Sequence, residues 1–177
     1  GRDREMANIL IAEDEERISR SIQKGLRASG YEGKIAIDTS EAPLIATVAG
    51  EYKPTLIKPN SEELAQLTGS DNWEELEASP ELTARTAQKL LGDGIEYVLA
   101  TLGGGGAVLV TEQGIWHAVH ELIQVRSTVG AGDSSLSGFL IAHTRGEDAP
   151  GCLVQAVAHG SAAAALPGTR MPSLEQT

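Results

Sequence analysis

A glycine-rich turn beside an aspartate is the part of this chain with the clearest chemical potential. Gly130, Ala131 and Gly132 precede Asp133, and an apolar run at 136–142 follows. A turn of this kind that opens a helix presents free backbone N–H groups, which can bind a phosphate. An aspartate in the first helical turn can take the proton from a hydroxyl that attacks the phosphate. The spacing therefore predicts phosphoryl transfer to an alcohol. The alternative is an ordinary glycine loop with Asp133 as a helix cap.

A lysine, an asparagine and a glutamate follow a predicted strand at 54–57 and begin a predicted helix. Lys58 can meet a phosphate as a point charge, and Asn60 and Glu63 can hold Mg²⁺ through its water molecules. The alternative is a helix start in which Asn60 caps the helix and Glu63 closes a capping box. The two roles are compatible. The residues thus allow Lys58 and Asn60 to contact a cofactor, and Asn60 and Glu63 to bind the metal weakly through water, and they leave the capping role equally open.

Four consecutive glycines follow the predicted strand at 95–101. Glycines between Thr101 and Gly106, including Gly103, let the backbone approach a ligand closely. The segment is neither a P-loop nor a dinucleotide fingerprint, because no Gly-Lys-Ser/Thr follows and no helix opens there. A flexible hairpin turn is the alternative. The ligand role gains weight from the motif at 130–133, because both segments would lie where open α/β sheets bind ligands, at the carboxyl ends of strands.

The composition excludes several classes of partner. A net charge of −11 and an aromatic content of 3% argue against nucleic acid, because phosphates attract basic patches and bases stack on aromatic rings. The nearly apolar run at 156–166 is too short to span a bilayer. The single cysteine, Cys152, cannot form an internal disulfide, and the four histidines are too scattered to predict a zinc site. We therefore predict a cytoplasmic protein without a nucleic-acid or membrane partner.

The order of the predicted elements indicates an α/β fold in one domain, residues 1–177. The predicted strands are 7–12, 34–38, 54–57, 95–101, 106–111, 114–119 and 122–126. The predicted helices are 15–29, 41–49, 61–68, 80–91, 131–145 and 150–166, with a loop or short helix at 70–77. Early alternation of strand and helix favours parallel βαβ units, whereas the later short strands favour hairpins. We predict three layers, with a mainly parallel sheet, flanking helices and an antiparallel edge.

Five segments, taken in their order along the chain, are similar to motifs of a known family. They are 35–40 (IAIDTS), 56–64 (LIKPNSEEL), 101–107 (TLGGGGA), 127–134 (STVGAGDS) and 160–165 (GSAAAA). Together they resemble the ribokinase-like carbohydrate kinases, most of all the fructose-1-phosphate kinase (1-phosphofructokinase) branch. The resemblance covers 33–173 and implies the C-terminal, nucleotide-binding half of such a kinase, with ATP and Mg²⁺ as cofactors. It implies that Asp133 is the base, that the loop from Thr101 to Gly106 lies along the nucleotide, and that Ser161 lies by the adenine.

The first part of the chain resembles a different family. Residues 6–32 combine a buried strand that ends at Glu13 and Asp14 with an amphipathic helix. This unit resembles the first strand and helix of a response-regulator receiver domain, although no aspartate follows at the position of the phosphate acceptor. We therefore predict a chimera formed by segment recombination, without receiver signalling. Residues 1–5 are expected to be a cloning remnant or flexible lead.

The resemblance also implies what the sequence lacks. In this family the sugar is held by a Gly-Gly-x-x-x-Asn segment and a small β lid, and neither has a counterpart here. The leading hypothesis is a folded chimera that keeps part of an ATP site and has little or no kinase activity. The alternatives are an active ATP-dependent sugar-phosphate kinase with Asp133 as base, and a purely structural chimera without a ligand. Apolar surface left uncovered by the missing half predicts a homodimer.

Overall fold

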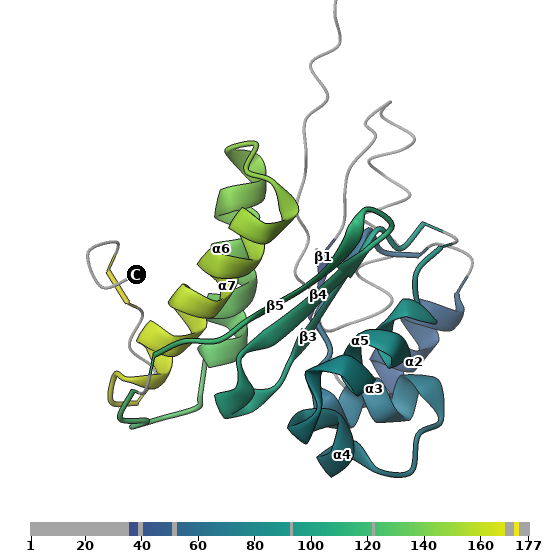
Figure 1. The fold of residues 1–177 in the computed structure, drawn as a ribbon, viewed down its shortest axis with the longest axis horizontal. Helices are drawn as coiled ribbons and strands as arrows, with labels where there is room; N and C mark the ends of the chain where they lie inside the picture. The colour runs from purple at the N-terminus through teal and green to yellow at the C-terminus, as the bar shows by residue number, and fades with distance from the viewer. Residues whose placement is uncertain are drawn as a thin grey trace, which may run out of the picture.

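A computed structural model of the chain describes residues 36–38, 41–50, 53–92, 94–121, 123–168 and 172–173 (Figure 1). The receiver-like unit predicted at 6–32 and the lead at 1–5 lie outside the described residues. The described elements form three layers, in which a β-sheet lies between two groups of helices (Figure 1). The predicted α/β class is therefore confirmed.

Within the described residues, the sheet has five strands, and their spatial order follows the chain. The strands are β1 (Ala36–Ile37), β2 (Leu56–Ile57), β3 (Tyr97–Thr101), β4 (Ala107–Thr111) and β5 (Gly114–Ala118). β1, β2 and β3 pair in parallel, with Ile37 opposite Ile57 and Ile57 opposite Val98. β3, β4 and β5 pair antiparallel. The carboxyl ends of β1, β2 and β3 thus meet at one edge of the sheet.

The sheet is mixed rather than mainly parallel, which corrects the prediction for the described part of the chain. The glycine segment after β3 and the turn at 112–113 reverse the chain twice, so that β4 and β5 form hairpins. Residues 123–126, predicted as part of a strand, form none. The backbone N–H of Arg126 donates to the Ala164 carbonyl at 2.8 Å, and that of Ser127 donates to the same oxygen at 3.2 Å. This segment therefore runs past a helix end instead of pairing with β5.

The helices cover both faces of the sheet. One face carries α2 (Glu41–Ala49), α3 (Ser61–Thr68), α4 (Trp73–Ala78) and α5 (Pro80–Gln88), and the other carries α6 (Ala131–Thr144) and α7 (Ala149–Ala164) (Figure 1). A short 3₁₀ turn, η1 (Gly103–Gly105), joins β3 to β4. The helix bounds follow local signals, because Asn60, Asn72, Ser79 and Asp148 each cap a helix with a side-chain oxygen. The short helix expected within 70–77 is α4.

Two hydrophobic clusters fill the spaces between the layers. Alternate residues of β4 enter different clusters: Leu109 faces α6 and α7, whereas Val108 and Val110 face α3 and α5. All three side chains are 0% exposed, so β4 is covered on both faces.

Cys152 is buried in the first cluster, and burial together with nearby Glu147 and Asp148 raises the pKa of its thiol to about 11. Within the described ranges, no helix combines the length and apolar character needed to cross a bilayer.

Candidate functional site

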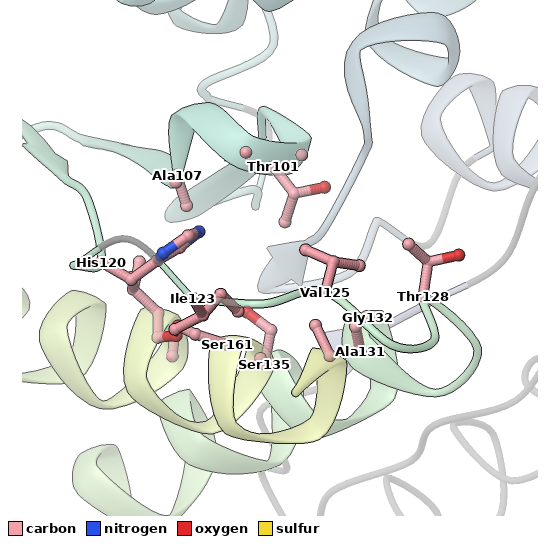
Figure 2. Close-up of a pocket in the computed structure, with 17 residues that line it drawn as sticks. Thr101, Ala107, His120, Ile123, Val125, Thr128, Ala131, Gly132, Ser135 and Ser161 are labelled. Carbon is pink, nitrogen blue, oxygen red and sulfur yellow. The ribbon is translucent and has the colours of Figure 1, made fainter. Parts of the chain in front are cut away.

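A cavity of about 220 Å³ lies between the loop after β3 and the facing helices α6 and α7 (Figure 2). Its walls come from η1, the segment 120–128, the first turns of α6 and the inner face of α7. Figure 2 shows Thr128, Ala131 and Gly132 at one end of the cavity and His120 at the other. Residues from three separate stretches of the chain, 101–107, 120–135 and 156–164, therefore line one site.

The glycine turn forms the N-terminus of α6, as predicted. Gly130 is the N-cap, and no side chain caps the helix there. The first N–H groups of a helix have no partner within it, so this end is able to bind an anion. Asp133 lies in the first turn but does not cap the helix. The alternative prediction, that Asp133 caps the helix, is therefore wrong. Ala131 and Gly132 line the cavity.

A buried lysine approaches the glycine turn from the neighbouring sheet edge. Lys58, directly after β2, is only 7% exposed, and its Nζ lies 3.0 Å from Asp38 Oδ1. A Cβ added to Gly132 would lie 3.0 Å from the same Nζ. Lys58 and Asp133 do not line the cavity themselves, but both lie beside Gly132, which does. The fold thus brings the predicted phosphate-binding lysine to the predicted phosphate-binding turn.

Asp38 is a site residue that the sequence analysis did not identify. Burial raises the pKa of Asp38, Lys58 lowers it, and Asp133 raises it further through its charge and a side-chain hydrogen bond. Two carboxyl groups and one ammonium group are therefore gathered at one point. The signal was available in the sheet register: Ile37 lies opposite Ile57, so the next residues, Asp38 and Lys58, leave the sheet side by side.

Asn60 and Glu63 form the capping box that was the alternative to metal binding. Asn60 Oδ1 accepts the Glu63 N–H at 2.8 Å, and the Asn60 N–H donates to Glu63 Oε2 at 2.9 Å. Burial raises the pKa of Glu63; the Asn60 N–H and the charge of Lys58 lower it, and Asp38 raises it again. Glu63 therefore also belongs to the charged group around Lys58.

The donor set fits Mg²⁺ only as a hydrated ion. In the described part of the chain, no three His, Cys, Asp or Glu side chains form a group that could hold a metal. Mg²⁺ commonly keeps several waters and is bound through one or two carboxylates plus substrate phosphates. Glu63, whose charge interacts with that of Lys58, would supply one such carboxylate, and Asn60 would assist through water. The weak, water-mediated metal role of this pair stays a prediction.

The glycine segment is the connection of the β3–β4 hairpin, as the alternative predicted, and hydrogen bonds give it a defined shape. Thr101 forms a parallel bridge with Asn60, and its carbonyl accepts the Ser61 hydroxyl at 3.4 Å. The His117 Nε2 lies 2.9 Å from the Gly105 carbonyl oxygen. Thr101, Gly103 and Gly106 all line the cavity, as a nucleotide-binding loop would.

Small residues of α7 form the floor of the cavity. Gly160 and Ser161 both line it, and the Ser161 hydroxyl donates to the Val157 carbonyl. Sequence reasoning predicted Ser161 but missed His120 and Ile123, because a segment without regular structure carries no periodic signal.

Comparisons with known proteins show the family of this chain. Residues 4–176 match the pfkB family of carbohydrate kinases. A 1-phosphofructokinase from Haloferax volcanii is 39% identical over 142 residues, which are 80% of this chain and 44% of that protein. The match leaves the receiver interpretation of residues 6–32 without support, since these residues lie inside it.

Solved structures show the same relationship. Phosphofructokinase-2 from Escherichia coli in complex with substrates and products superposes with a TM-score of 0.75 at 28% identity, over 90% of this chain and 50% of that one. Ribokinase from Thermotoga maritima shares the fold, with a TM-score of 0.65 at 21% identity, over 84% of this chain and 49% of that one. The chain spans about half the length of these relatives. It belongs to the pfkB family of carbohydrate kinases.

Proposed function

We propose that this chain provides the ATP site and the general base of a sugar-phosphate kinase. The observation that carries the proposal is the position of Lys58, whose Nζ pairs with Asp38 and lies 3.0 Å from where a Cβ on Gly132, at the N-terminus of α6, would be. A fixed cation and a helix N-terminus beside one cavity suit a chain of phosphates. The similarity to a 1-phosphofructokinase supports a phosphorylated ketose, fructose 1-phosphate, as the acceptor.

The reaction assigned to these residues is an in-line transfer. A hydroxyl oxygen of the sugar attacks the γ-phosphorus, the Asp133 carboxylate takes the hydroxyl proton, and the bond from phosphorus to the ADP oxygen breaks. The N–H groups at Gly132 and the Lys58 ammonium group stabilise the negative charge on the transferred group. Mg²⁺, held beside Glu63 through water, would neutralise the charge of the β- and γ-phosphates.

The expected rate of phosphate transfer depends on how well the chain holds the sugar that accepts the phosphate. The sequence has no counterpart of the Gly-Gly-x-x-x-Asn segment or the small lid that hold the sugar in the family. Orientation of a reacting hydroxyl is worth up to about 7–11 kcal/mol. We therefore propose that the chain by itself binds ATP but transfers its phosphate slowly. The homodimer stays a prediction.

Calorimetric titration with ATP and Mg²⁺ tests the site. The parent chain should give a saturable heat of binding, and Gly132→Val should abolish it, because the new side chain would occupy the space between the turn and Lys58 Nζ. Ser137→Ala is the matched control, since it changes an exposed side chain one turn further along α6. Absence of binding by the parent chain would favour the purely structural alternative.

Turnover with fructose 1-phosphate separates the two enzymatic hypotheses. We expect ADP formation far below the ~10 s⁻¹ of a typical enzyme. A rate near that value would show that the chain positions the sugar without the family's usual segments. Asp133→Asn should then remove the activity while leaving ATP binding measurable.

A further inference from the structure

We infer that His120 selects adenine nucleotides at this site by accepting a hydrogen bond from the amino group of the base. The inference rests on the proposed function, because it concerns the end of the same cavity that lies away from the phosphate-binding turn. It assigns a specificity-determining role to a residue of the irregular segment after β5.

The two ends of the cavity differ in chemistry. Thr128, Ala131 and Gly132 lie at the end formed by the N-terminus of α6, next to Lys58. His120 and Ile123 lie toward the opposite end, with Ser161 of α7 near Ile123 (Figure 2). Apolar and small side chains suit the faces of a flat heterocyclic ring. The phosphates therefore belong at the α6 end and the base at the end of His120.

The hydrogen bonding of His120 fixes which nitrogen can face a ligand. Its Nδ1 lies 2.6 Å from the Glu121 carbonyl oxygen. A carbonyl oxygen only accepts hydrogen bonds, so Nδ1 carries the proton and donates it. In the neutral ring Nε2 is then an acceptor. Figure 2 shows the half-buried ring directed into the cavity, which gives Nε2 access to the base.

An acceptor at this position discriminates between purines. The amino group at position 6 of adenine donates a hydrogen bond, whereas the oxygen at the same position of hypoxanthine or guanine accepts one. An oxygen facing the Nε2 lone pair leaves two acceptors in contact without a proton between them. A site built to hydrogen-bond one group rejects the analogue that lacks it. We therefore expect ATP to bind better than ITP and better than purine riboside triphosphate, which has no group at position 6.

Calorimetric titration of these three triphosphates, with Mg²⁺, tests the inference. The parent chain should prefer ATP to purine riboside triphosphate by about tenfold, the value of one good hydrogen bond. His120→Ala and His120→Phe should both bring this ratio to about one, although Phe keeps a ring of similar size. His120→Gln, which retains an acceptor, should keep part of the preference. Glu121→Ala is the matched control, because it keeps the backbone carbonyl that orients His120.

The outcomes separate this inference from the proposed function. If the parent chain binds none of the triphosphates, the nucleotide site itself is wrong, and the role of His120 falls with it. If the parent chain binds them and His120→Phe keeps the full preference for ATP, only the role of His120 is wrong. If His120→Ala fails to fold, His120→Phe and His120→Gln are compared instead. Loss of the preference for ATP in His120→Phe, with partial preference in His120→Gln, would support the role of His120. Full preference in His120→Phe would contradict it.

Discussion

Replacing Lys58 with methionine is expected to lower the free energy of unfolding by about 3 kcal/mol at pH 8 and by clearly less at pH 5. The side chains of Lys58 and Asp38 are only 7% and 19% exposed, so the substitution leaves a largely buried carboxyl group without its cation. Urea unfolding of the parent chain and of Lys58→Met at both pH values measures the effect.

The sign of the pH dependence follows from Asp38. Burial holds its pKa above the ordinary value of 3.8, and Lys58 is the group that counters this rise. Without Lys58 the pKa rises further, so the folded state binds the proton more tightly than the unfolded state. The stability that protonated Asp38 contributes is fully present below pH 3.8, and it is lost as the pH rises through the raised pKa of Asp38. The deficit of Lys58→Met therefore grows from pH 5 to pH 8.

Two variants serve as controls for the lysine substitution. Lys89→Met removes an exposed lysine at the end of α5 and should cost little at either pH. The double variant Lys58→Met with Asp38→Asn removes both charges, and it should recover much of the loss at pH 8. An equal loss at both pH values, or no recovery in the double variant, would contradict the assignment of a buried ion pair.

Replacing Gly106 with alanine should lower the free energy of unfolding by about 3 kcal/mol or more and weaken ATP binding. Gly106 has φ 82° and ψ −131°, a conformation that is strained for any residue with a Cβ. That Cβ would lie 2.0 Å from the Ala118 carbonyl oxygen, so β4 and the end of β5 would have to separate. Gly106 also lines the cavity, so the same substitution should change the shape of the proposed ATP site.

The neighbouring glycine provides the control for this second substitution. A Cβ at Gly104 would meet nothing within 4 Å, and Gly104 lines the same cavity. Gly104→Ala should therefore stay close to the parent chain in urea unfolding. Equal midpoints for Gly104→Ala and Gly106→Ala would contradict the close contact between Gly106 and the Ala118 carbonyl.

Local signals predicted much of the fold. α2 and α3 have the predicted bounds, and α3 begins at the Asn60 capping box and ends before Gly69, the two signals that a short stretch of sequence can carry. The mixed sheet was harder to predict, because parallel or antiparallel pairing depends on partners far away in the chain. The segment 123–126 has strand-like composition, yet its neighbouring N–H groups bond to the end of α7.

Some residues of the site could also be predicted from the sequence, and others could not. The motif at Asp133 and the residues around Lys58 stand out because their types and spacing are unusual. Asp38 could be recognised only through the register of β1 on β2, which places it beside Lys58. His120 gave no signal, since a single histidine in an irregular segment has no pattern. Its part in the cavity follows from a turn of the chain that no short window of sequence defines.

The double coverage of β4 bears on how the protein melts. Val108 and Leu109 belong to different hydrophobic clusters, so neither helical layer can leave without exposing this strand to water. The two layers should therefore melt cooperatively, in a single transition. The two tryptophans report on different layers, because Trp73 lies in α4 and Trp116 packs on the cluster formed with α6 and α7. Fluorescence of Trp73→Phe and Trp116→Phe should give one midpoint; two midpoints would mean that the layers unfold independently.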